Sequence, residues 1–137
     1  MRLRPIVKQI WEIYAPCVGH GDDVTIVAAL GDETFSQMVA LLDHVARAPQ
    51  GPRCLPNNRN HAICADPKIL QMSFGGTQRL AYFYDEQKLI IVAHLYKKSG
   101  GSGKVKSSDL NVAVRRHRAY FDAKATGKLE FLPEVES

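Results

Sequence analysis

The sequence has 137 residues, of which 45% are apolar and 23% charged, so it can form one domain with a buried core and is not intrinsically disordered. No apolar run approaches the roughly 20 residues that cross a bilayer, and Lys8 and Glu12 interrupt the N-terminal segment, so we expect neither a membrane span nor a signal peptide. The three cysteines never form CxxC, which favours the reducing cytoplasm. We therefore expect one cytoplasmic domain over residues 1–137, with its core at about 10–126.

The net charge of +4 is unevenly distributed along the chain. Residues 1–66 carry six Lys or Arg against seven Asp or Glu, whereas residues 67–128 carry twelve against four. The last nine residues, 129–137, form an acidic tail with three glutamates. A basic segment of this size predicts either a surface that binds a phosphate backbone or an ordinary solvated surface rich in lysine.

The first half of the chain predicts a strand followed by helices. The segment Ile10–Cys17 is rich in aromatic and β-branched residues, which indicates a strand. We expect Asp22 or Asp23 to cap a first helix, and the apolar spacing predicts an amphipathic helix over Glu33–Ala48. The proline- and asparagine-rich segment Gln50–Pro67 is expected to be irregular.

Three strands at hairpin spacing follow. They are Lys68–Phe74, Arg79–Tyr84 and Lys88–Tyr96, with glycines or polar residues between them. The third strand is apolar almost throughout, which predicts a central strand covered on both faces.

A last helix is expected to have Ser107 or Ser108 as its N-cap and to end at Gly127. The order of elements predicts an α+β domain with an antiparallel sheet of about four strands. N-terminal helices and a C-terminal helix would pack on one side of that sheet.

The glycine-rich segment Ser99–Gly103 does not match the motif of a nucleotide-binding P-loop. Gly103 and Lys104 could supply the Gly-Lys pair, but Lys98 stands where the motif needs its first glycine and Val105 where it needs a hydroxyl. We interpret the segment as a connector between a strand and a helix.

Basic and aromatic side chains are expected to meet at one edge of the sheet. In an antiparallel meander, Arg79 at the start of one strand adjoins Lys97 and Lys98 at the end of the next. The connector carrying Lys104 and Lys106 begins at the same place, and the strands also carry Tyr82, Tyr84 and Tyr96. Cations with aromatic rings are the combination that binds single-stranded nucleic acid, although aromatic rings are also common in half-buried sheets.

Metal binding and serine hydrolysis have little support in the sequence. Cys54, His61 and Cys64 have the spacing C-x6-H-x2-C without a fourth ligand nearby, so we expect no metal site. No G-x-S-x-G motif is present. His94 and His117 could be core or surface residues or proton-transfer groups.

The segment from Asp66 to Gly100, followed by the last helix, resembles the RelE/ParE toxin superfamily and is most similar to its HigB-like, phage-associated branch. The similar features are an arginine-led strand that ends in aromatic residues and an apolar strand that runs into Tyr96-Lys97-Lys98. The family often has an acidic residue and an arginine in the strand where this chain has Gln71 and Ser73.

The resemblance implies a RelE-like fold and the toxin of a type II toxin–antitoxin pair. Such toxins are commonly metal-independent endoribonucleases that need no cofactor and cut messenger RNA on the ribosome. A partner antitoxin, often a helix-turn-helix protein, neutralises them. A gyrase poison of the same superfamily and a non-catalytic module that binds nucleic acid or protein are the alternatives.

Metal-free RNA cleavage needs cations for the charge that grows on the phosphorane and a group that moves protons. We assign the first role to Arg79, Lys97 and Lys98, and we name His94 or Tyr82 for proton transfer. The residues expected to bind RNA around them are Lys68, Tyr96, Lys104, Lys106, Arg115 and Arg116.

Overall fold

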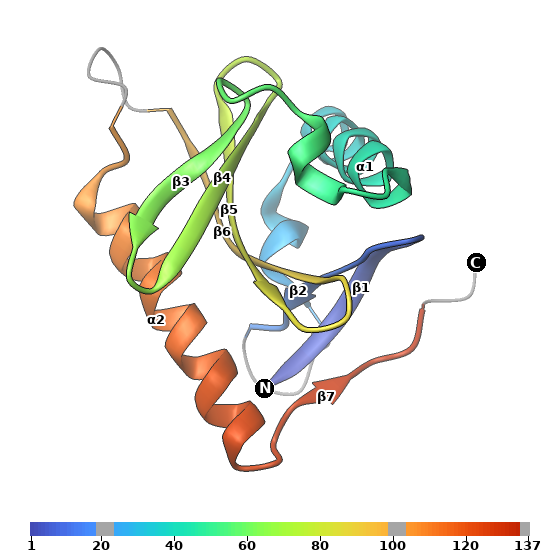
Figure 1. Cartoon of the computed structure of the whole chain (residues 1–137), viewed down its shortest axis with the longest axis vertical. Coiled ribbons are helices and arrows are strands. Elements are labelled where there is room, and N and C mark those ends of the chain that lie inside the picture. Colours follow the sequence, from blue (N-terminus) through green and yellow to red (C-terminus); the bar gives the residue numbers. More distant parts are fainter. Residues whose placement is uncertain (19–23, 99–103, 135–137) are drawn as a thin grey trace.

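The computed structural model describes residues 1–18, 24–98 and 104–134. Its strands form one sheet in the order β3-β4-β5-β6-β2-β1-β7 (Figure 1). The strands are β1 Arg2–Lys8, β2 Glu12–Pro16, β3 Asn60–Ala65, β4 Lys68–Phe74, β5 Gln78–Asp85, β6 Leu89–Lys97 and β7 Glu130–Phe131. The helices are α1 Asp32–Arg47 and α2 Ser107–Ala125, with short 3-10 helices η1 Ile26–Ala29 and η2 Gly51–Cys54. No helix in the described part of the chain is long and apolar enough to cross a membrane.

The expected antiparallel sheet of about four strands is wrong, because the sheet has seven strands and is mixed. The four expected strands correspond to β2, β4, β5 and β6, and the first of these pairs in parallel with the last. The additional strands are β1, β3 and β7, and β7 also pairs in parallel with β1. The structure remains α+β, with strands added at both sides of the expected meander.

The expectation that the helices share one side of the sheet is also wrong. Side chains of β5 alternate, so Leu80 and Tyr82 pack in the cluster that contains α1. Ala81 and Phe83 pack in the cluster that contains Ala113 of α2. The two long helices therefore cover opposite faces (Figure 1), and β6 lies at the centre with buried residues on both, as its apolar sequence predicts.

The predicted helices are largely present. α1 agrees with the predicted Glu33–Ala48 to within one residue at each end. The stretch before it is only the 3-10 helix η1, capped by Thr25, and the proposed caps Asp22 and Asp23 lie outside the described residues. α2 begins after Lys106 rather than after a capping serine. The connector Ser99–Gly103 lies outside the described residues as well.

A bulge in β6 determines which residues share the α2 face. Ala81 pairs with His94 and Tyr82 with Val92, which leaves Ala93 as an extra residue on β6. Ala93 already belongs to the α2-side cluster, and after it Tyr96 packs on the same side. An extra residue shifts the alternation of a strand, so the bulge brings Tyr96 to the α2 face.

A buried carboxylate fixes the C-terminal half of α2 to the sheet. Asp85, at the end of β5, accepts hydrogen bonds from the Tyr120 hydroxyl at 2.5 Å and from the Lys124 ammonium at 2.8 Å. Its side chain is 8% exposed. Burial acts to raise the pKa of Asp85, but the hydrogen bonds from Lys124 and Tyr120 outweigh it and hold the pKa below its ordinary value.

We predict that Asp85→Asn lowers the free energy of unfolding by about 1–3 kcal/mol at neutral pH, because the hydrogen bonds to a charged acceptor are lost. The folded-state pKa is lowered, so the stabilisation is present above the unfolded pKa of about 4 and is lost as the pH falls through the folded value. Urea unfolding at neutral and acidic pH should show the two proteins converging in acid. Asp122→Asn, at an exposed carboxylate of α2, is the control. A difference that does not change with pH would contradict this role.

Candidate active site

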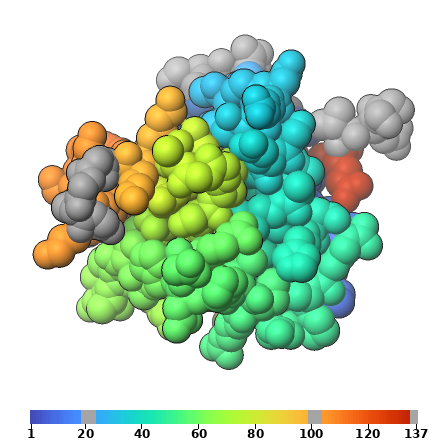
Figure 2. Space-filling view, turned by 90° about the horizontal axis from the view of Figure 1, so that it is seen from above, coloured from blue at the N-terminus to red at the C-terminus, as the bar shows by residue number. Residues whose placement is uncertain are grey.

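One hollow of about 180 Å³ lies where the ends of β4 and β6 meet the start of β5 and the approach to α2. Figure 2 shows this face, with the green and yellow-green segments of β3 to β5 beside the orange segment that leads into α2. The residues that line the hollow are Asn58, His61, Gln71, Ser73, Arg79, Tyr96, Lys97, Lys98, Lys104, Val105 and Lys106.

Strand register brings the cations of this hollow together. Ser73 pairs with Arg79, Arg79 with Tyr96, and the neighbouring Gln78 with Lys97. Arg79, Lys97 and Lys98 therefore share the hollow with Lys104 and Lys106, as the meander geometry predicts. The described lining residues include no carboxylate.

Arg79 is held in place by backbone oxygens. Its Nη1 donates to the carbonyl oxygen of Gly76 at 3.0 Å and to that of Gln78 at 2.8 Å. Its Nε and Nη2 have no hydrogen-bond partner among the described residues. The guanidinium is thus oriented by the β4–β5 turn and keeps donors for a phosphate.

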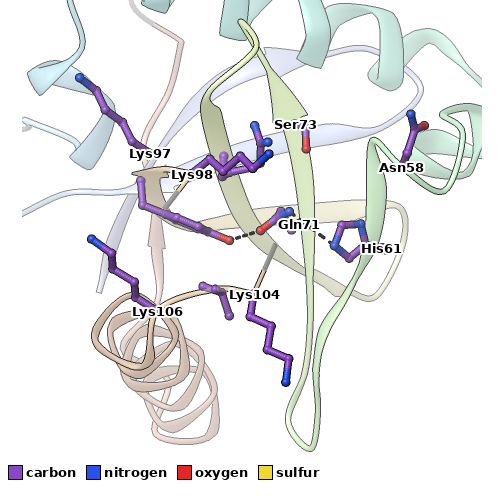
Figure 3. A pocket seen from close by; sticks show the side chains of 11 residues that line it. Asn58, His61, Gln71, Ser73, Lys97, Lys98, Lys104 and Lys106 are labelled. Atoms are coloured by element: carbon purple, nitrogen blue, oxygen red, sulfur yellow. Dashed lines mark hydrogen bonds between the residues drawn. The ribbon is translucent and has the colours of Figure 1, made fainter. Parts of the chain in front are cut away.

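The lysines form a rim rather than a single cluster. In Figure 3, Lys97 and Lys106 extend away from His61, and the side chain of Lys104 points in a different direction from both. Lys97, Lys98 and Lys106 are exposed and form no ion pair with any described residue. Spaced and solvated cations of this kind suit an extended polyanion better than a single small anion.

Hydrogen-bonded side chains form the floor of the hollow (Figure 3). The Tyr96 hydroxyl donates to Oε1 of Gln71, whose side chain is buried, and Nε2 of Gln71 faces Nε2 of His61 at 3.5 Å. Nδ1 of His61 lies 3.2 Å from the carbonyl oxygen of Asn57. A carbonyl only accepts and an amide nitrogen only donates, so His61 carries its proton on Nδ1 and a lone pair on Nε2.

Tyr96 stays protonated at neutral pH. Burial and, to a lesser extent, the carboxylate of Asp109 raise the pKa of Tyr96 above its ordinary value, against the opposing charge of Arg79. The phenol therefore remains the hydrogen-bond donor that Gln71 needs.

His94 supports this floor without lining the hollow. Its ring stacks on Tyr96 with centroids 5.5 Å apart and an interplanar angle of 17°. Its Nε2 contacts the carboxylate of Asp109 at 2.8 Å, and its Nδ1 lies 3.5 Å from Nη1 of Arg116. Both ring nitrogens are engaged, so His94 positions Tyr96 and has no free nitrogen for substrate.

The other predicted site residues lie elsewhere. Tyr82 is fully buried on the α1 face, where it donates to Asn60 and where burial raises its pKa. Lys68 lies at the far end of β4, paired with Ala65. Arg116 donates to the carbonyl oxygen of Ala93 at 2.9 Å, and Arg115 is exposed on α2 outside the hollow.

Sequence reasoning missed His61 and Gln71 as a pair. The spacing of His61 with Cys54 and Cys64 raises only the question of a metal site, and the described residues contain no group of three or more His, Cys, Asp or Glu that could hold a metal ion. Predicting β3 would have revealed the pair, because this strand places His61 directly opposite Gln71 of β4.

Comparisons with protein-family models, with curated proteins and with solved structures gave no match. A functional assignment therefore depends on the hollow, on its chemistry and on the resemblance carried by the segment from Asp66 to Gly100.

We predict that neutral His61 carries its proton on Nδ1, whereas neutral His94 carries it on Nε2 to donate to Asp109. Long-range ¹H–¹⁵N spectra distinguish the two tautomers. Gln71→Leu should shift His61 toward a tautomer mixture and leave His94 unchanged, with Ser73→Ala as the control. A proton on Nε2 of His61 in the unsubstituted protein would contradict this floor geometry.

Proposed function

We propose that this protein is a RelE/ParE-type toxin of a type II toxin–antitoxin pair, and that it cuts messenger RNA on the ribosome without a metal. The single observation that carries the proposal is the hollow itself, in which five cations and His61 line one site and no carboxylate is present among the described lining residues. That combination suits a phosphodiester whose charge rises during the reaction.

In this proposal the cations stabilise the reacting phosphate. Nε2 of His61 accepts the proton of the 2′-hydroxyl as the 2′-oxygen bonds to phosphorus, and the bond from phosphorus to the 5′-oxygen breaks. The departing 5′-oxygen takes a proton from water, and His61 afterwards returns its proton to solvent. The products are a 2′,3′-cyclic phosphate and a free 5′-hydroxyl. His61 takes the role first considered for His94 or Tyr82, because neither of those residues lines the hollow.

A non-catalytic module that binds RNA is the second candidate. Gln71 and Ser73 favour it, because the family often has an acidic residue and an arginine in this strand.

In the toxin proposal, a helix-turn-helix antitoxin would neutralise the protein, and a neighbouring gene for such an antitoxin would support the proposal.

We predict that Arg79→Ala and Lys98→Ala each lower RNA cleavage, by about 10²–10³-fold for the oriented Arg79. His61→Ala should lower it by about 10²–10⁴-fold, because proton transfer is lost. Growth arrest after expression without antitoxin, with the cleaved messenger mapped by primer extension, measures both effects. Lys68→Ala, a cation outside the hollow, is the matched control and should stay toxic.

If Arg79→Ala and Lys98→Ala each cut RNA as fast as the unsubstituted protein, the assignment of these residues to the site would be wrong. RNA binding without cleavage by the unsubstituted protein would favour the non-catalytic module. Damage to DNA supercoiling with intact messenger RNA would instead indicate a gyrase poison.

A further inference from the structure

A second hollow, of about 380 Å³, borders the first. The two share Asn58, Ser73 and Arg79 as lining residues, so they are neighbouring parts of one groove. The second hollow, called here the adjoining hollow, is completed by Arg59 and by the β4–β5 turn at Gly75-Gly76. Neither the resemblance nor the position of the meander points to Arg59.

Arg59 is fixed to the wall between the two hollows. The backbone N–H of Ser73 donates to the carbonyl oxygen of Arg59 at 3.0 Å, and Nη2 of Arg59 lies 3.4 Å from the carbonyl oxygen of Ser73. Arg79 is attached to the same turn through Gly76, at 3.0 Å. Two arginines are therefore held beside one shared wall, each by the backbone of the β4–β5 hairpin.

The adjoining hollow has the chemistry of the first without its acid–base groups. Arg59 is its additional cation, and no carboxylate lines it among the described residues. The turn presents bare backbone at Gly76, where a Cβ would meet nothing within 4 Å, whereas the side chain of Gln37 lies 2.6 Å from the Cβ position of Gly75. A charged strand can thus approach this wall closely.

We propose that a single RNA strand continues from the first hollow across Arg79 into the adjoining hollow, where Arg59 binds a neighbouring phosphate. This subsite rests on the proposed RNA-directed function, but it requires only binding and not cleavage. In this arrangement Arg79 contacts the reacting phosphate, and Arg59 extends the site to a longer stretch of the RNA strand. Since phosphate contacts position a strand without reading its bases, the subsite adds affinity independently of sequence.

The test uses two 2′-O-methyl RNA probes, which cannot be cut because the attacking hydroxyl is blocked. One is a dinucleotide with a single phosphate, and the other is a tetranucleotide. Binding is followed by NMR titration at several salt concentrations. Arg59→Ala should leave dinucleotide affinity unchanged, weaken the tetranucleotide and reduce its slope of log K against log salt by about 0.7, the value for one phosphate on a single strand. Arg59→Lys should keep the slope, because it keeps the charge.

Arg53→Ala is the matched control, since Arg53 is an exposed arginine outside both hollows and should change neither probe. Arg79→Ala should weaken both probes. The subsite is overturned if Arg59→Ala weakens both probes alike, weakens neither, or if the unsubstituted protein binds neither. Tight tetranucleotide binding that depends on Arg59, in a protein that leaves unmodified RNA uncut, would support the subsite and refute only the ribonuclease function.

Discussion

The site depends on one extra residue in β6. A shift of one position reverses the face of every later side chain in a strand, and Ala93 introduces that shift next to Ala81 of β5. Without it, Tyr96 would face α1 and Arg79 would pair with Leu95, so Arg79 and Tyr96 would not lie together beside Gln71. The buried part of β6 tolerates the shift because it is apolar on both faces. The residues of β6 before the bulge therefore pack in both hydrophobic clusters, whereas Tyr96, after the bulge, lies in the polar site.

The hollow combines two kinds of side chain with different physical requirements. On the floor, Gln71 is buried and must have its hydrogen bonds satisfied, which it achieves between Tyr96 and His61. On the rim, Lys97, Lys98 and Lys106 remain exposed, so water screens their mutual repulsion. The floor can thus fix the tautomer of His61 while the side chains of the rim stay exposed to solvent.

Local patterns predict the elements that carry their own signal. β4, β5, β6 and α1 agree with period-2 or helical spacing to within one residue at each end. The strands that were missed depend on non-local pairing, since β3 lies among prolines and β7 has two residues. The convergence of Arg79 with Lys97 follows from meander register, which the sequence indicates. The contact between His61 and Gln71 does not follow from the meander, because it depends on the pairing of β3 with β4. Tyr82 lies outside the site because its side chain is buried on the α1 face.

The attachment of α2 is part of the site even though most of the helix lies away from it. Asp85 holds the C-terminal half of the helix, and the contact between His94 and Asp109 holds its first turn. An aspartate in that turn is also stabilised by the helix dipole, so both effects favour the same docked position. Lys106 is the N-cap residue of α2 and therefore moves with the helix. The position of the basic rim on this side is consequently set by packing and hydrogen bonds on the α2 face.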